Sequence, residues 1–136
     1  MPRPALLARL ALAGMLAILV FHQGLQGLAY WGGVLPGGPY NLTPVPPFGV
    51  PRLVSLLAWG AVWGVVIGLL VMRLRWWLRV PVAAVLGAAL PTLFTWLVVL
   101  PLRGLPPTST VLALGAALFA AWGLGLVLFM ALLRVR

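Results

Sequence analysis

The sequence predicts an all-α membrane protein, a four-transmembrane-helix bundle, from three observations. Hydrophobic residues make up 64% of the 136 residues and charged residues only 7%. The chain contains no aspartate, glutamate or lysine. Its apolar residues gather in four runs, each with the ~20 residues that a helix needs to cross a bilayer. Because a water-soluble domain needs roughly a quarter of its residues charged, lipid must surround most of this chain.

The four runs predict helices over residues 5–29, 53–74, 80–102 and 109–133, since backbone groups in hydrocarbon must be satisfied within the segment. The first run is long for a secretory signal and carries polar residues near its end, so we interpret it as a retained helix. The runs form one transmembrane domain over residues 1–136. The loop at 30–51 is uncharged and rich in proline and glycine, and we expect it at the outer mouth of the bundle.

The arginines predict the orientation. With four spans both termini share one side, and only Arg52 and Arg103 lie on the other. The shared side holds seven arginines, namely Arg3, Arg9, Arg73, Arg75, Arg79, Arg134 and Arg136. Positive residues favour the cytoplasmic side, so both termini are expected in the cytoplasm. The Arg-only basic set, with abundant alanine, glycine and proline, favours a GC-rich bacterium and therefore its inner (plasma) membrane.

The missing residue types exclude most site chemistry. A chain without carboxylates cannot build a carboxylate pair or a carboxylate metal site, and a chain without cysteine has no thiolate nucleophile or iron–sulfur ligand. One histidine with scattered serine and threonine is not a catalytic constellation. We therefore predict no catalytic, cofactor-binding or metal-binding residues, no cofactor and no enzyme activity. The net charge is +9, and the arginines that carry it lie at the ends of the apolar runs. This placement indicates anionic lipid headgroups as partners. We expect no binding of nucleic acid.

His22, Gln23 and Gln26 form the most polar cluster in the predicted spans. His22 and Gln26 are four residues apart and share one face of a helix. Together with Arg52 and Arg103, which have no acidic side chain to pair with, they make a candidate polar site at the outer mouth. The alternative is that the cluster caps loop carbonyls and that the two arginines only anchor helices at the interface.

Small residues predict close helix packing. Gly60, Gly64 and Gly68 recur every four residues and form a candidate helix-packing face, used either inside the bundle or as a homodimer seam. In the third span Pro91 leaves a carbonyl without its N–H partner and bends the helix. Either the hydroxyls of Thr92 and Thr95 bond the freed carbonyls, or the bend opens a pathway through the bundle.

A two-helix internal duplication is a further possibility. Gly14 precedes Phe21 by seven residues, as Gly87 precedes Phe94. In each half a Pro-Pro pair precedes a Trp-Gly pair by a similar interval, and the half ends in Arg-x-Arg. A duplication of two helices predicts a pseudo-two-fold axis along the membrane normal, with the first and third helices superposing as the second and fourth do.

A resemblance to known proteins rests on three strings taken together: FHQG at 21–24, PVPPFGVP at 44–51 and WGAVWG at 59–64. The chain resembles small, uncharacterised four-transmembrane-helix proteins of bacterial inner membranes. The resemblance implies the fold and the location, and no activity.

Two functions remain open. The first is a structural or accessory membrane protein, which packs with itself as a homo-oligomer or with a membrane-protein partner through small-residue helix faces. The second is a small transporter, channel or lipid-binding module for an anionic or neutral ligand. Its site would lie at the outer mouth, because the missing carboxylates argue against cation transport.

Overall fold

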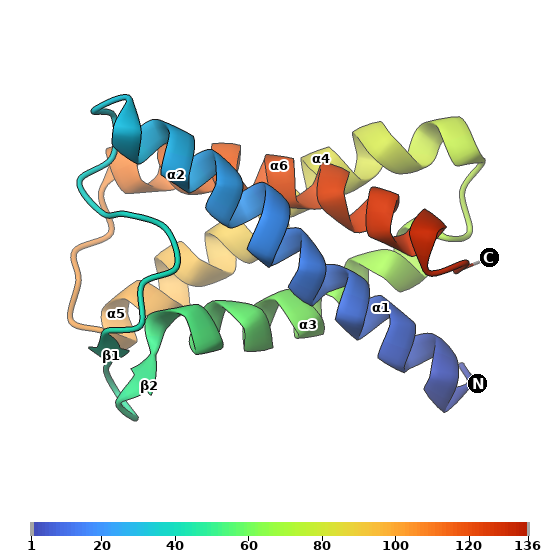
Figure 1. Ribbon diagram of the computed structural model, residues 1–136, viewed down its shortest axis with the longest axis horizontal. Helices are drawn as coiled ribbons and strands as arrows, with labels where there is room; N and C mark the ends of the chain where they lie inside the picture. Colours follow the sequence, from blue (N-terminus) through green and yellow to red (C-terminus); the bar gives the residue numbers. More distant parts are fainter. Residues whose placement is uncertain (1, 136) are drawn as a thin grey trace.

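The structure, a computed structural model that describes residues 2–135, consists of four helical rods packed side by side (Figure 1). The rods cover Pro4–Trp31, Arg52–Val71, Trp76–Leu102 and Ser109–Leu132. Each is long and apolar enough to cross a membrane. The shortest has 20 residues, about 30 Å of helix. The predicted four-helix fold is therefore confirmed, and the protein is a multi-pass integral membrane protein.

Two of the rods are interrupted by π-helical turns. The first rod runs through α1 (Pro4–Ala17), the π-helical turn η1 (Ile18–His22) and α2 (Gln23–Trp31). The third runs through α4 (Trp76–Phe94), the π-helical turn η2 (Thr95–Val99) and α5 (Leu100–Leu102). The other two rods are the single helices α3 (Arg52–Val71) and α6 (Ser109–Leu132). Such turns occur frequently at functional sites.

The helix bounds differ from the prediction mainly at the turn between α3 and α4. α3 ends at Val71, three residues earlier than expected, and α4 begins at Trp76, four residues earlier than expected. Arg79 explains the tight turn, because its guanidinium donates hydrogen bonds to the carbonyls of Met72 (2.9 Å) and Leu74 (3.2 Å). These bonds satisfy acceptors that the end of a helix leaves free, so few residues are needed before the next helix begins.

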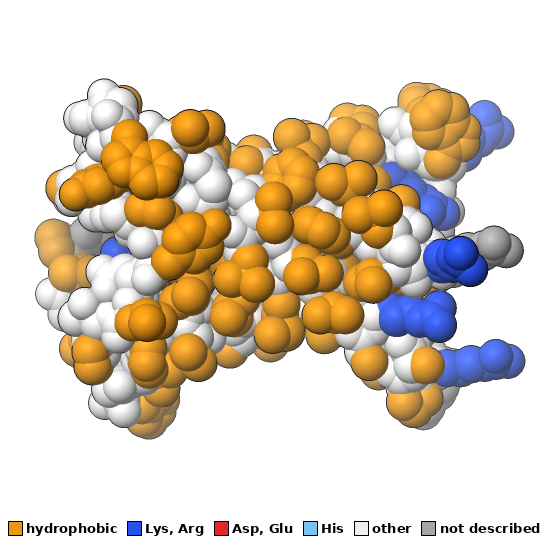
Figure 2. Space-filling view, viewed as in Figure 1, with side chains coloured by type: hydrophobic (Ala, Val, Ile, Leu, Met, Phe, Trp, Pro, Cys, Tyr) orange, Lys and Arg blue, Asp and Glu red, His pale blue; other side chains and the backbone are white. Residues whose placement is uncertain are grey.

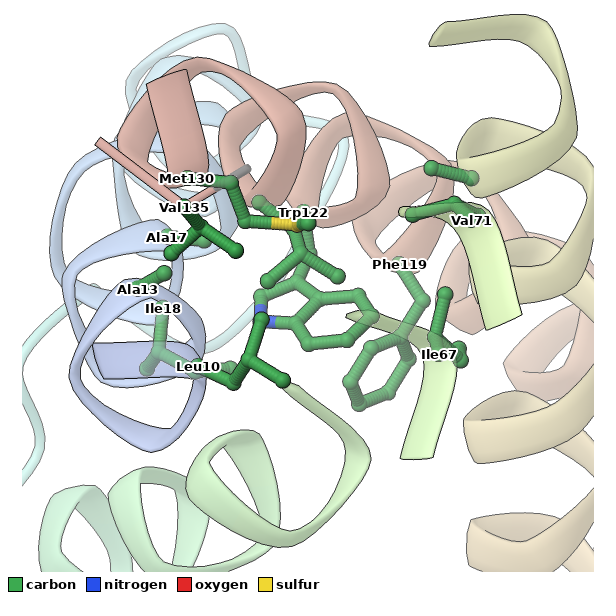
Figure 3. Close-up of a cluster of buried hydrophobic side chains, with 12 residues drawn as sticks. Leu10, Ala13, Ala17, Ile18, Ile67, Val71, Phe119, Trp122, Met130 and Val135 are labelled. Carbon is green, nitrogen blue, oxygen red and sulfur yellow. The ribbon is translucent and has the colours of Figure 1, made fainter. Parts of the chain in front are cut away.

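The core lies where α1, α3, α4 and α6 meet (Figure 3). Trp122 of α6 is its largest fully buried side chain. Figure 3 shows the indole above Leu10 of α1 and beside Phe119. The indole Nε1–H donates to the carbonyl oxygen of Gly14 at 3.0 Å. A polar group in this apolar interior needs such a partner.

Glycine permits the closest contact between helices in the first half. A methyl group at Gly64 would lie 2.7 Å from the carbonyl oxygen of Leu10, and one at Gly14 would collide with the carbonyl of Gly60. The backbones of α1 and α3 therefore touch. Gly60, Gly64 and Gly68 are all buried beneath α1, where Gly68 faces the side chain of Leu10.

The second half repeats this crossing. A methyl group at Gly123 would collide with the carbonyl of Ala83, and one at Gly87 would lie 2.5 Å from the carbonyl oxygen of Phe119. Ala83 and Gly87 are four residues apart, as Leu10 and Gly14 are. In each half the earlier of these two residues lies against a glycine of the second helix, and the later one lies against a carbonyl four residues before that glycine.

The alignment that the sequence suggested pairs Gly14 with Gly87 and Gly64 with Gly123. Both pairs occupy equivalent places in the two crossings. Each half also has a π-helical turn in its first rod, but η2 begins four residues beyond the position that the alignment pairs with the start of η1. The matched glycine contacts agree with the internal duplication, and the superposition of the two halves about an axis stays a prediction.

The proline in the third rod is accommodated inside the helix. Pro91 cannot donate to the carbonyl of Gly87, and the hydroxyl of Thr92 lies 3.5 Å from that oxygen. Thr92 is buried. The arrangement matches the first of the two alternatives drawn from the sequence, and η2 begins four residues after the proline.

The long connection between the first two rods folds over one end of the bundle (Figure 1). Its only regular elements are β1 (Pro44–Val45) and β2 (Val50–Pro51), which pair antiparallel. Large exposed side chains at this end include Trp31, Tyr40 and Phe48. We call this the loop end of the bundle.

The opposite end carries both chain termini and the α3–α4 turn (Figure 1). The blue surface in Figure 2 gathers there. Its described arginines are Arg3, Arg9, Arg73, Arg75, Arg79 and Arg134, and Arg136 lies outside the described residues. The belt between the two ends is covered with apolar side chains (Figure 2).

Candidate functional site

A cavity of about 490 Å³ opens at the loop end of the bundle. Its walls come from η1, α2, the long loop, α3, α4, η2, the turn after α5, and α6. His22 and Thr95, which are equivalent positions of the two halves, both line it, and so do the equivalent Leu56 and Gly115. The cavity is therefore lined by residues from both halves of the chain.

The cavity extends into the membrane-spanning part of the bundle. On α6 its lining runs from Val111 to Phe119, nine residues that span about 12 Å of helix. On the third rod it runs from Thr92 to Leu100, a similar depth. Most of these wall residues are leucine, valine or aromatic residues.

Two arginines line the same cavity. Arg52 is the first residue of α3, and Arg103 follows the end of α5. Both are partly buried. Arg103 donates a hydrogen bond to the hydroxyl of Ser55 at 3.1 Å. The side-chain hydrogen bonds found within residues 2–135 include none from the Arg52 guanidinium. Figure 2 shows arginine surface recessed at the loop end.

The two guanidinium groups are close enough to repel one another. Burial lowers the pKa of Arg103, and the positive charge of Arg52 lowers it further. No side-chain carboxylate exists in the sequence to compensate these charges. Because like charges in a partly dehydrated site are costly, an anion bound between them would stabilise the arrangement.

Gln23 connects the helix to the loop. Its Oε1 accepts a hydrogen bond from the backbone N–H of Tyr40 at 2.7 Å. Since a backbone N–H can only donate, this contact fixes which end of the amide is oxygen. The Nε2 then lies 3.0 Å from Nδ1 of His22 and donates to Oε1 of Gln26 at 3.1 Å.

The same network assigns the tautomer of His22. An amide nitrogen has only hydrogens to offer, so Nδ1 must accept from Gln23. A neutral ring then carries its proton on Nε2, which remains to contact a molecule in the cavity that His22 lines. The ring is 3% exposed and packs against Phe119 with centroids 4.8 Å apart.

Gln26 holds the loop across the mouth. Its Nε2 donates to the carbonyls of Gly37 (3.3 Å) and Gly38 (3.2 Å). Both interpretations of the polar cluster therefore find support. Gln23 and Gln26 cap loop groups, whereas His22 lines the cavity. Gln23 is not in the cavity wall, although it belonged to the candidate site.

The polar groups left facing the cavity are mainly donors. Thr92 is engaged with Gly87, and the indole N–H of Trp96 donates to the carbonyl of Thr108 at 2.9 Å. The remaining groups are the guanidiniums of Arg52 and Arg103, Nε2–H of His22 and the hydroxyl of Thr95. Such a set suits a ligand that carries acceptor oxygens and negative charge.

Sequence reasoning missed the α6 wall and the role of Ser55. Leu114, Gly115 and Leu118 look like any apolar part of a span, so nothing in their composition marks them. Thr95 was expected only to bond a carbonyl freed by Pro91, although the internal alignment that pairs Phe21 with Phe94 places it opposite His22. The packing face Gly60, Gly64 and Gly68 lies under α1, deeper in the bundle than the cavity.

Comparison with known protein families, with curated proteins and with solved structures finds no match to this chain.

Proposed function

We propose that this small integral membrane protein is a binding module for an anion, held by Arg52 and Arg103 in the cavity at the loop end. One observation carries the proposal. Two partly buried guanidinium groups line one cavity in a chain that has no side-chain carboxylate. Structural arginines of this kind normally pair with a carboxylate, and here the counter-charge has to come from a bound molecule.

The balance of donors and acceptors supports an anion over a cation. Hydrogen bonds to charged groups contribute about 1.5–3 kcal/mol each, and phosphate or carboxylate oxygens can accept from both arginines at once. A cation would meet two positive charges and no carboxylate. The proposal is binding, and no reaction is assigned to the site.

The orientation forms part of the proposal. The arginine-rich end carries six described arginines and the loop end two. Positive residues favour the cytoplasmic side, so we place both termini in the cytoplasm and the cavity on the outer face of a bacterial inner membrane. The anion would then reach the site from outside the cell or from the outer leaflet.

An accessory role through small-residue faces stays a prediction. The glycine face that suggested it is covered by α1 within the same chain, so a partner would have to use another surface. A protein retained with the chain when it is extracted in native lipid discs would favour this role.

The proposal is tested with inorganic phosphate in maltoside micelles, which contain no phosphate of their own. Thermal unfolding is compared in phosphate and in chloride of equal ionic strength. A ligand at ten times its dissociation constant stabilises the folded state by about 1.4 kcal/mol. We expect such stabilisation for the native chain, and its loss in Arg52→Gln and in Arg103→Gln.

Arg73→Gln is the matched control, because Arg73 is exposed at the opposite end of the bundle. It should keep the phosphate effect in full. Equal stabilisation of all four proteins, or no stabilisation of the native chain at any phosphate concentration up to tens of millimolar, would rule out an anion site at these arginines.

A further inference from the structure

The shape of the cavity points to a more specific ligand class. Resting on the proposed function, we infer that the anion is the head of an amphiphile, a lipid phosphate with one hydrocarbon chain, which enters from the leaflet at the loop end. The phosphate contacts Arg52 and Arg103, and the chain lies against the apolar walls below them.

The first argument is size. The cavity measures about 490 Å³, within the ~300–1,000 Å³ typical of sites for organic ligands. One water molecule accounts for only about 30 Å³ of liquid. A free phosphate would therefore leave most of the cavity to be filled by water. The walls formed by Leu56, Leu100, Leu114, Leu118 and Phe119 would then remain hydrated, which is unfavourable for apolar surface.

The second argument is direction. Arg52 and Arg103 belong to helix ends, whereas the apolar walls continue about 12 Å toward the centre of the membrane. Half of a hydrocarbon core is about 15 Å. A lipid in the leaflet has the same arrangement, with its charge at the interface and its chain pointing inward. It can occupy the cavity without inverting.

The third argument is the open space at Gly115. A methyl group there would meet only Cγ2 of Thr92, at 3.5 Å, which is an ordinary van der Waals contact. Unlike Gly64 or Gly123, this glycine is not in contact with another backbone. Its missing side chain widens the cavity. The donors of His22 and Thr95 line the same walls and match the ester oxygens at the head of an acyl chain.

The test uses two photoreactive probes in maltoside micelles. One is a twelve-carbon alkyl phosphate with a diazirine at the chain end, and the other is the alkyltrimethylammonium with the same chain. Both probes partition into micelles through the same hydrocarbon chain. A difference in labelling between them therefore reports recognition of the charged head group. We expect the phosphate probe to label residues 114–119 and 92–100, where the cavity is lined. The ammonium probe should label only the lipid-facing belt.

Four variants sharpen the result. Arg52→Gln and Arg103→Gln should lower labelling of these walls about tenfold, the loss expected for a charged hydrogen bond. Gly115→Leu fills the wall and should block labelling while keeping the stabilisation by inorganic phosphate. Gly24→Leu is its control, because a Cβ at Gly24 would meet nothing within 4 Å, and it should change neither readout.

The outcomes separate the inference from the proposed function. If inorganic phosphate stabilises the protein through both arginines but the alkyl phosphate labels the walls no more than the ammonium probe does, the site takes a small anion and the inference is wrong. Wall labelling that survives both arginine substitutions also overturns it, because the chain would then bind without its head. If phosphate does not stabilise and the walls are not labelled, both proposals fail.

Discussion

The indole N–H of Trp122 donates to the backbone carbonyl of Gly14 at 3.0 Å, and this hydrogen bond joins the two halves of the molecule. Trp63, the equivalent of Trp122 in the first half, makes no such bond and packs against Phe94 with ring centroids 5.9 Å apart. The two helix crossings therefore differ at these tryptophans. One half contributes a polar contact between helices, and the other contributes an aromatic one.

Replacing Trp122 by phenylalanine tests this contact. The carbonyl of Gly14 keeps its bond from the N–H of Ile18, so no acceptor is left unsatisfied, and we expect a loss of about 1 kcal/mol. Alanine removes the whole side chain and should cost about 3–5 kcal/mol. Thermal unfolding in maltoside micelles measures both. Trp77→Phe, at an exposed position, should leave the unfolding temperature unchanged. A phenylalanine variant as stable as the native chain would mean that the bond contributes nothing.

The crossing of α1 and α3 predicts a severe effect at Gly64. A valine there would drive its Cβ to 2.7 Å from the carbonyl oxygen of Leu10 and 2.8 Å from Cα of Gly14. Backbone atoms cannot move aside as a flexible side chain can, so we expect destabilisation at or above the upper end of the 1–3 kcal/mol typical of overpacking, about 3 kcal/mol or more. Yield of monodisperse protein and its unfolding temperature check this.

The matched control for that substitution is Gly24→Val. A side chain at Gly24 meets nothing within 4 Å, so the variant reports only the cost of valine in a helix. Near-native yield and stability of both variants would show that the two backbones do not approach as closely as described.

Gln23 should control the order of the loop over the cavity. Gln23→Leu removes the acceptor for the N–H of Tyr40 and the donors to His22 and Gln26. Losing one such bond is expected to speed hydrogen exchange at the Tyr40 amide about tenfold. Exchange followed by mass spectrometry over residues 36–43 gives the readout. Asn41→Ala, which removes only a local bond to Thr43, should not affect Tyr40. Unchanged protection in Gln23→Leu would refute the role of this side chain.

The proposed orientation can be tested because the chain has no cysteine. Ser109→Cys and Arg75→Cys place single thiols at exposed positions at opposite ends of the bundle. In bacterial cells with a permeabilised outer membrane and an intact inner membrane, a membrane-impermeant maleimide should label the cysteine at 109. The cysteine at 75 should react only after the inner membrane is permeabilised. The reverse pattern would place the cavity on the cytoplasmic side.

Much of the fold could be predicted because insertion into lipid depends on local composition. Four apolar runs with at most one charged residue each are sufficient to indicate four spans, and the arginines mark the two ends. The glycine pattern was visible too, since Gly14 and Gly87 make equivalent backbone contacts in the two crossings. The bounds near Val71 and Trp76 were less accurate, because Arg79 closes that turn through carbonyls five and seven residues before it.

The candidate site was predicted only in part. His22, Gln26, Arg52 and Arg103 were singled out as polar residues in an apolar chain, and the cavity is lined by all four. Gln23 was grouped with them, yet it binds the loop instead. Leu114 and Leu118 gave no signal, since lipid-facing and cavity-facing leucines are alike in composition.

The sequence alone determined that this chain lies in a membrane as four helices, because transfer from water to hydrocarbon is a property of each segment. Only the tertiary structure decided that α1 and α3 touch at Gly14 and Gly64, and that His22 and Thr95 line one cavity. Those relationships join residues from different helices, and they depend on how backbones approach one another, which no local composition encodes.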